Sequence, residues 1–270
     1  MSIPNTIRFA LIITLFSAFT LLKRDTPTLY LIGDSTVDDG TGKDGLWGWG
    51  KFLPQFFDTT QVHIRNYAQG GTSTRTFYTG GIWDKKLNHR GLWDTVVTKL
   101  KKGDYLLIQF GLNDVSPVDD STRSRGTLPG IENDSVSIYN KVLHHPEVVH
   151  SFGWYLTQFI ATAKAKGVTV IVCSTVPRNQ WKDGKLIRGE KGFAEWAMQV
   201  AQREKTFSID LNNLIADAYD KEGQTNTTSI YHTSKDNTHT TEAGATLNAS
   251  IVATSIKAFK KCKLSKYIIK

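Results

Sequence analysis

The chain has few cysteines, no low-complexity tract and no internal repeat, and each of these absences excludes a class of protein. Two cysteines are too few for a disulfide framework, although Cys173 and Cys262 leave a single disulfide open. Without repeats or biased tracts, fibrous, solenoid and disordered classes are excluded. A hydrophobic content of 40% and a charged content of 21% are ordinary for a soluble globular protein. At 270 residues, the chain is long enough for one substantial domain.

Long apolar runs are also scarce, and the clearest one lies at the N-terminus. The uncharged run 9–22 is preceded by Arg8 and followed by Lys23 and Arg24. This run is short for a membrane span but typical of a secretory leader. Residues 1–25 are therefore predicted to be a signal peptide or an N-terminal anchor, and the protein is predicted to be exported, secreted or periplasmic. No clear small-x-small cleavage site follows, so the sequence leaves open whether the leader is removed or retained as the one contact with a membrane.

A strong charge of one sign is missing from the body of the chain, despite a formal net charge of +8. Residues 1–25 hold three of the 33 basic residues, residues 257–270 hold six, and together these ends hold one of the 25 acidic residues. The stretch between them is formally neutral. No basic stripe interleaved with aromatic residues is present, so nucleic acid is not an expected partner. Residues 261–270 are interpreted as a solvated basic C-terminal tail that follows a domain at 26–260.

What the chain does contain is an alternation of apolar strands with amphipathic helices, which predicts an α/β domain built on a parallel sheet. The predicted strands are Thr28–Gly33, Val62–Tyr67, Tyr105–Phe110, Val168–Ser174 and Phe207–Asp210. The predicted helices are Gly48–Phe57, Leu92–Lys101, Phe152–Lys166, Phe193–Glu204, Leu211–Asp220 and Glu242–Lys260. Two long irregular stretches, 112–147 and 177–192, each follow a strand, at the edge where open α/β sheets bind ligands.

Two short segments carry residues suited to nucleophilic chemistry. The first predicted strand ends in Gly-Asp-Ser-Thr, where Ser35 could expose its hydroxyl at the sheet edge. This is not the Gly-x-Ser-x-Gly elbow of α/β-hydrolases. Near the C-terminus, Asp236 precedes His239 by three residues, which is a suitable spacing for a carboxylate that orients an imidazole. In isolation each segment is better explained as a turn or a helix cap.

Two further segments place hydrogen-bond donors after the second and third strands. Gly71 lies in Ala-Gln-Gly-Gly-Thr-Ser, and Asn113 lies in Gly-Leu-Asn-Asp. With Ser35 and His239, these four segments resemble, in order, the blocks of the SGNH/GDSL hydrolase superfamily. The Gly-Asp-Ser-Thr variant, followed by Asn-x-Ala-x-x-Gly-x-Ser and Asp-x-x-His-Thr, is most similar to the rhamnogalacturonan acetylesterases, carbohydrate esterase family 12. The resemblance covers residues 28–259, and none of the four block residues departs from the pattern.

The resemblance implies a flavodoxin-like three-layer α/β/α sandwich with a five-stranded parallel sheet in the order 2-1-3-4-5. It implies that Ser35 is the nucleophile, that His239 is its base, and that Asp236 orients the histidine. The oxyanion hole would be formed by the N–H groups of Ser35 and Gly71 and by the side chain of Asn113. This chemistry requires no metal and no organic cofactor.

Three side chains near the predicted site are candidates for substrate binding. Arg75 and Arg178 each follow a predicted strand and could clamp a carboxylate of a uronic acid. Trp181, in the second long stretch, could stack on a sugar ring. Carboxylates at positions 34, 38 and 39 are interpreted as turn caps rather than a glycosidase pair, and histidines at 144, 145 and 150 as surface residues rather than metal ligands.

The sequence therefore predicts an exported, monomeric serine esterase that removes O-acetyl groups from a plant cell-wall polysaccharide, rhamnogalacturonan in particular. Two alternatives stay open. One is the same machinery acting on another acyl ester, such as acetylxylan or a short-chain lipid ester. The other is a carbohydrate-binding protein that has kept the fold without catalysis. The residues themselves favour an enzyme, because the nucleophile, the base, the orienting carboxylate and all three oxyanion donors are present.

Overall fold

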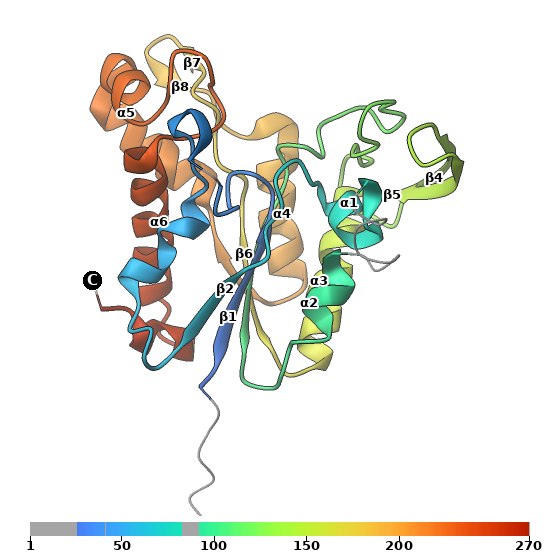
Figure 1. The fold of residues 1–270 in the computed structure, drawn as a ribbon, viewed down its shortest axis with the longest axis horizontal. Helices are drawn as coiled ribbons and strands as arrows, with labels where there is room; N and C mark the ends of the chain where they lie inside the picture. The colour runs from blue at the N-terminus through green and yellow to red at the C-terminus, as the bar shows by residue number, and fades with distance from the viewer. Residues whose placement is uncertain (1–25, 41, 83–91, 270) are drawn as a thin grey trace, which may run out of the picture.

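The central element is a five-stranded, fully parallel sheet, seen in a computed structural model that describes residues 26–40, 42–82 and 92–269 (Figure 1). Its strands run in the order β2-β1-β3-β6-β9. In chain order this is the 2-1-3-4-5 arrangement, so the predicted flavodoxin-like sheet is confirmed. The strands are β1 (Thr28–Gly33), β2 (His63–Asn66), β3 (Tyr105–Gln109), β6 (Thr169–Cys173) and β9 (Phe207–Ile209).

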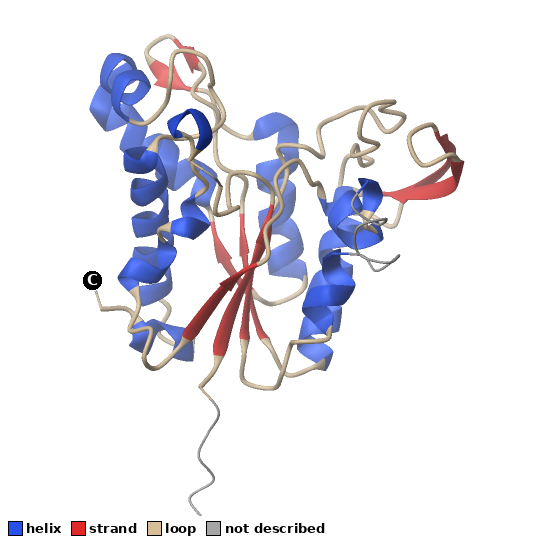
Figure 2. Ribbon diagram, viewed as in Figure 1, coloured by secondary structure: helices blue, strands red, loops and turns tan. Residues whose placement is uncertain are grey.

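Helices cover both faces of this sheet and make the three layers visible in Figure 2. One face carries α1 (Thr74–Thr79), α2 (Leu92–Val97), α3 (Phe152–Ala165) and α4 (Phe193–Arg203). The other face carries α5 (Leu211–Ile230), α6 (Glu242–Lys257) and the short 3-10 helices η2 (Trp49–Lys51) and η3 (Leu53–Phe56). Two further 3-10 turns, η1 (Lys43–Gly45) and η5 (Glu190–Gly192), lie in loops.

The alternation of side chains along each strand divides the core into two clusters. In β1, Leu29 and Leu31 face α5 and α6, whereas Tyr30 and Ile32 face α1 to α4. In β3, Leu107 and Ile108 divide in the same way. Because both faces are covered by helices, the inner strands β1, β3 and β6 are apolar at almost every position. This continuous apolarity is the signal that located the strands in the sequence.

The two long stretches predicted to be irregular each contain a small antiparallel hairpin. The first holds β4 (Ser135–Asn140) and β5 (His145–His150), and the second holds β7 (Trp181–Lys182) and β8 (Lys185–Leu186). The β4–β5 hairpin projects from the body of the domain (Figure 1). Its side chains are mostly exposed, and β5 contains Pro146, which argues against a strand in a sequence. For these two reasons the sequence pattern does not indicate the two strands of the hairpin.

Two predicted helices differ from the observed elements. Residues 48–57 form the two 3-10 helices rather than one α-helix, because Pro54 lacks an N–H and obstructs a continuous α-helix. The helix predicted to end at Asp220 continues to Ile230 beyond Gly223, which interrupts it with a positive φ of 78°. A glycine normally marks the end of a helix, and here the chain resumes its helical path after it.

The C-terminal segment is part of the fold, which corrects its interpretation as a solvated tail. Residues 263–267 form the 3-10 helix η6 (Lys263–Tyr267), and Leu264 is completely buried. The N–H of Asp58 donates to the carbonyl of Tyr267 at 2.8 Å, and Ile268 pairs with Phe57. The domain therefore extends through these residues, with its lysines on the outside of a buried apolar edge.

Cys173 and Cys262 are both buried and both free thiols. Each belongs to the core cluster beneath α5 and α6. No helix among the described residues is both long and apolar enough to cross a membrane. The predicted leader, residues 1–25, lies outside the part of the chain that the structure describes.

Candidate active site

Ser35 lies where β1 ends, at the carboxyl edge of the sheet. A single helical turn follows, in which the N–H groups of Val37 and Asp38 both donate to the carbonyl of Asp34. Gly33 allows this tight turn, since a Cβ at that position would lie 2.6 Å from the carbonyl oxygen of Gln109. The Ser35 side chain is half-buried, and its backbone N–H donates to no other residue in the described part of the chain.

A chain of buried polar side chains supports this turn from below. The indole N–H of Trp49 donates to Gln109, whose amide donates to the hydroxyl of Thr36, at 2.8 Å each. The Thr36 hydroxyl in turn donates to Asp34 at 2.7 Å, and the Thr36 N–H donates to the same carboxylate oxygen at 2.9 Å. Burial raises the pKa of Asp34, against the lowering effect of the two bonds from Thr36. The residues on both sides of the nucleophile are thereby fixed.

His239 and Asp236 come from the loop before α6 and meet Ser35 across 204 residues of sequence. Nε2 of His239 lies 2.8 Å from Oγ of Ser35, and Nδ1 lies 2.7 Å from Oδ2 of Asp236. Because an ionised carboxylate only accepts, Nδ1 carries the proton and Nε2 is free to accept from the serine. The structure thus aligns the three side chains in the order that proton transfer requires.

Asp236 is held as a carboxylate by its own loop. Its Oδ1 accepts from the N–H groups of Thr238 at 2.7 Å and His239 at 2.9 Å. Partial burial works against the charged form, but these bonds and the one from the His239 ring outweigh it and lower the pKa of Asp236. An ionised Asp236 fixes the tautomer of the histidine and stabilises its positive charge once it is protonated.

The loop that carries His239 is fixed at two points. The buried His232 ring lies 3.0 Å from the carbonyl of His239 through Nδ1, and burial lowers the pKa of His232, which favours a neutral ring that donates there. The N–H of Trp47 donates to the carbonyl of Thr240 at 2.8 Å, and the Thr240 hydroxyl donates back at 3.1 Å. This second contact ties the segment after Ser35 directly to the residue after His239.

Gly71 lies in the loop between β2 and α1 with a φ of 82°, a conformation that favours glycine. The neighbouring Gly70 N–H donates to Asp38 at 2.9 Å. The Gly71 N–H, by contrast, donates to none of the described residues. Of the two glycines, Gly71 therefore offers the available donor. Asp38, interpreted from the sequence as a turn cap, holds this loop against the nucleophile turn.

Asn113 follows β3, and both ends of its side-chain amide are held. Its Nδ2 donates to the carbonyl of Thr72 at 2.8 Å, and its Oδ1 accepts from Nη1 of Arg125, also at 2.8 Å. Each amide nitrogen has two hydrogens, so one N–H of Asn113 remains for a ligand. The amide thus links the Gly71 loop with the long segment after β3.

Asp114, the next residue, has a buried carboxyl group in which only one oxygen accepts hydrogen bonds from described residues. Its Oδ1 accepts from the N–H of Thr74 at 3.0 Å and from the Thr74 hydroxyl at 2.5 Å, while Oδ2 has no partner among the described residues. Burial raises the pKa of Asp114 to about 7, against the lowering effect of the bonds from Thr74. Asp114 therefore anchors the start of α1 beside the site and titrates near neutral pH.

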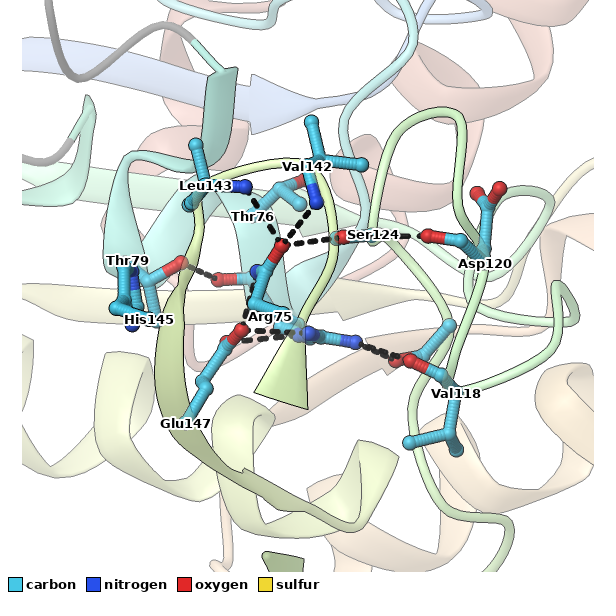
Figure 3. Close-up of polar contacts among 12 residues, drawn as sticks. Arg75, Thr76, Thr79, Val118, Asp120, Ser124, Val142, Leu143, His145 and Glu147 are labelled. Carbon is cyan, nitrogen blue, oxygen red and sulfur yellow. Dashed lines mark hydrogen bonds and ion pairs between the residues drawn. The ribbon is translucent and has the colours of Figure 1, made fainter. Parts of the chain in front are cut away.

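Arg75 does not face the site, and its predicted role in substrate binding is wrong. The side chain is completely buried and forms a two-point ion pair with Glu147 at 2.8 and 2.6 Å (Figure 3). Its Nη1 also donates to the carbonyls of Val118 and Gly126, at 2.9 Å each. A guanidinium that is buried and bonded in this way joins α1 to the long segment and the β4–β5 hairpin.

Arg178 and Trp181 do lie beside the catalytic loop. Arg178 donates to the hydroxyl of Thr238 and lines a cleft of about 500 Å³ with Gln180, Arg188 and Lys191. Trp181 donates to Asn179 at 2.7 Å. It lines a second cleft of about 510 Å³, which also includes Asp236. Asn237, two residues before His239, borders both clefts.

Some residues of the site gave little signal in the sequence. Gln109 lies in a strand that is otherwise apolar, where an amide is a recognisable anomaly. Asp114 belongs to the Gly-Leu-Asn-Asp block, and the sequence alone assigns it no role. His232 and Arg125 belong to no pattern of their own. Within the described chain, no group of three or more His, Cys, Asp or Glu residues is placed to hold a metal ion.

Comparison with known proteins places these residues in one family. Residues 31–247 match the model of the GDSL-like lipase/acylhydrolase family. The chain is 29% identical to a rhamnogalacturonan acetylesterase of Emericella nidulans, over 82% of this chain and 81% of that one. It is 30% identical to the rhamnogalacturonan acetylesterase RhgT of Bacillus subtilis, over 85% of this chain and 89% of that one. The chain therefore belongs to the GDSL-like lipase/acylhydrolase family, the SGNH hydrolases, and is a carboxylic ester hydrolase.

Solved structures agree with this fold. Protein YxiM of Bacillus subtilis superposes with a TM-score of 0.66 at 25% identity, over 86% of this chain and 56% of that one, so the chain spans little more than half of it. An acetylxylan esterase from Geobacillus stearothermophilus superposes with a TM-score of 0.51 at 14% identity, over 88% of this chain and 95% of that one. The second likeness concerns the fold alone.

The buried ion pair of Arg75 and Glu147 leads to a prediction about stability. The Arg75→Ala substitution leaves the Glu147 carboxylate buried without its partner, which typically costs about 3–5 kcal/mol. We expect urea unfolding to show a loss of that size in the free energy of unfolding. The matched control is Asp119→Ala, which breaks the exposed pair of Asp119 and Lys141 at 3.8 Å and should cost less than about 1 kcal/mol. Equal losses in the two variants would contradict the buried role of Arg75.

Asp114 leads to a prediction about pH. Its pKa is about 7 in the folded protein, well above the value of about 3.9 for an aspartate in an unfolded chain, so the folded state binds more protons between these values. Stability should therefore fall as pH rises from about 4 to about 7 and then level off. In Asp114→Asn this fall should be shallower, as measured by urea unfolding at a series of pH values. An unchanged slope would show that Asp114 is not the group that titrates.

Proposed function

We propose that this esterase removes O-acetyl groups from an acetylated polysaccharide, rhamnogalacturonan in particular, through a covalent acyl-enzyme. The observation that carries the chemistry is the unbroken line of hydrogen bonds from Ser35 through His239 to Asp236 at an accessible sheet edge. The substrate is supported by the relatives, two of which are named rhamnogalacturonan acetylesterases and match over more than four fifths of their length.

In the first half of the proposed reaction, Oγ of Ser35 attacks the carbonyl carbon of the acetyl ester. Nε2 of His239, 2.8 Å away, takes the hydroxyl proton as the new C–O bond forms. The tetrahedral intermediate then collapses, and the ester C–O bond breaks. His239 passes its proton to the departing sugar oxygen, leaving an acetyl group on Ser35.

In the second half, water replaces the sugar. His239 accepts a proton from the water as its oxygen attacks the acetyl carbonyl, and it then returns the proton to Ser35, releasing acetate. Asp236 remains ionised throughout and stabilises the imidazolium. Besides the ester and water, this proposed cycle uses only side chains and N–H groups of the chain itself.

The proposed oxyanion hole consists of three donors on the loops that follow β1, β2 and β3. The N–H groups of Ser35 and Gly71 are both unbonded within the described chain, and Asn113 has one N–H to spare. Donors that are fixed before the reaction stabilise developing charge without reorganising. Removal of one such donor typically lowers kcat by about 10²–10³.

The two clefts beside the catalytic loop are the proposed contacts for the polysaccharide. Trp181 and Asn179 give the first cleft an indole and an amide, groups that suit a sugar ring. Arg178 and Lys191 give the second cleft positive charge, which suits the carboxylate of a galacturonate unit. Arg188, in the same cleft, is already paired with Asp217 and Asp220.

The N-terminal leader agrees with a substrate outside the cell. Arg8, an uncharged apolar run and the basic pair Lys23 and Arg24 occupy residues 8–24. We propose on this ground that the protein is exported, to the periplasm or the medium. We further propose that it acts as a monomer, since all the residues of the proposed cycle come from one chain. Detection of the protein in the extracellular or periplasmic fraction of cells that express the full chain would support its export.

The first test is acetate release from acetylated rhamnogalacturonan and from acetylated xylan. Wild-type protein should release acetate from the pectic polymer, and Ser35→Ala should lower kcat by about 10⁶. Asp236→Asn, which leaves the wrong tautomer of His239, should lower kcat by about 10⁴. Circular dichroism would verify that both variants are folded.

Other outcomes would separate the mechanism from the substrate. Release mainly from xylan, abolished in Ser35→Ala, would retain the mechanism and overturn the pectic assignment. No release from either polymer, together with hydrolysis of an aryl acetate, would point to another acyl ester. An inert wild-type protein in all three assays would leave a sugar-binding role.

A second test addresses Trp181. Trp181→Ala should raise the KM for the polysaccharide about three- to tenfold, the range expected for the loss of one aromatic contact. The kcat/KM for an aryl acetate should stay unchanged, because that ester has no sugar to contact the cleft. Trp181→Phe, which keeps an aromatic face, is the matched control and should retain most of the affinity. A change for both substrates would instead indicate a disturbed catalytic loop.

A further inference from the structure

Arg125, a residue outside the family's four blocks, contacts the proposed oxyanion donor. Its Nη1 donates to Oδ1 of Asn113 at 2.8 Å, and its Nε donates to the hydroxyl of Ser116 at 3.1 Å. The side chain is half-buried. We propose that Arg125 is a positioning residue, which orients and polarises the amide of Asn113 for the transition state. This inference rests on the proposed role of Asn113 in the oxyanion hole.

The contact fixes which end of the amide faces the substrate. An asparagine amide can rotate by 180° and exchange its oxygen with its nitrogen. A guanidinium has only donors, so it must face the amide oxygen. On the other side, the carbonyl of Thr72 can only accept, so it must face the nitrogen, 2.8 Å away. Together the two partners exclude the orientation that would present an oxygen to the oxyanion.

The positive charge has a second effect. A hydrogen bond from a guanidinium to the amide carbonyl draws electron density toward that oxygen, and hydrogen bonds that share an amide strengthen each other. The N–H groups of Asn113 thereby become better donors. This effect applies to any ester whose carbonyl oxygen occupies the hole, whatever alcohol it carries.

Arg125 is itself held by its two neighbours in the chain. The Ser124 hydroxyl donates to Oδ1 of Asn140 at 2.8 Å, and the Gly126 carbonyl accepts from Arg75 at 2.9 Å. Asn140 donates to the Glu147 carboxylate at 2.6 Å, which closes the network drawn in Figure 3. Asn140 and Glu147 belong to β4 and β5. The projecting hairpin thus braces the segment that presents Arg125.

A different role for Arg125 would be to bind a carboxylate of the substrate. The two roles predict different kinetics. A carboxylate clamp affects the KM for an acidic polymer and leaves a neutral ester unaffected. A positioning residue lowers kcat for every ester and acts only while Asn113 is present.

The test is a double-mutant cycle with p-nitrophenyl acetate, a neutral ester without a sugar. Arg125→Ala should lower kcat about tenfold or more, with KM changed by no more than about twofold, because the donor is misoriented but still present. In the Asn113→Ala background, the same substitution should change kcat by less than about twofold. Arg125→Lys, which restores one donor, should recover part of the loss. Arg123→Ala, which removes an exposed charge two residues away, is the matched control and should have no effect.

Several results would overturn the proposal. Equal losses of kcat in the presence and absence of Asn113 would show that Arg125 acts independently of it. A loss confined to the KM for the acidic polymer would assign it as a clamp. If thermal unfolding shows that Arg125→Ala is not folded, Arg125→Met, which keeps the length of the side chain without donors, replaces it. Wild-type activity on the aryl ester with none on rhamnogalacturonan would contradict the proposed substrate and leave this test intact.

Discussion

The carboxyl ends of five parallel strands meet at one edge of the sheet, and every feature of the site depends on that constraint. β1, β2 and β3 deliver Ser35, Gly71 and Asn113 to this edge from three separate parts of the chain. The loop before α6 adds His239 beside them. Because β1, β3 and β6 are buried between the helical layers, their positions are set by apolar packing that takes no part in the chemistry. The rigid sheet holds the loops within hydrogen-bonding distance of one another.

Such an arrangement places polar groups directly above an apolar core, where each must be bonded. Gln109 shows how this is achieved, since it joins Trp49 to Thr36 within a strand that is otherwise apolar. A buried polar group without a partner would cost about 1–3 kcal/mol. Among the described residues, Asp34 and Asp114 each retain one unbonded oxygen, and burial raises the pKa of both carboxyls against the lowering effect of the bonds from Thr36 and Thr74. The site thus carries a local cost in stability that the two apolar clusters offset.

The sequence alone predicts the sheet and the four blocks of the site. It does not predict the contacts that depend on which distant side chains are buried together. β1 was predicted to the residue because six apolar or small residues are bounded by turn signals. The position of Arg75 after a strand is typical of a ligand-binding residue, and only the fold shows that Glu147 lies opposite it. Arg125 gave no signal, since one arginine in a loop with serines has no periodicity. The β4–β5 hairpin has no core of its own, so its strands lacked the apolar pattern by which strands are recognised.

The buried C-terminal segment has a consequence for how the chain folds during synthesis. Leu264 and Ile268 complete the apolar edge next to Phe57, and the Ile269 N–H donates to Phe56. These partners are separated by some two hundred residues of sequence. A domain generally folds as a unit, and the ribosome makes its N-terminal part first. The apolar side of η3 therefore stays uncovered until residues 264–269 have also left the ribosome. Closure of this edge is a late event, which follows the synthesis of all five strands of the sheet.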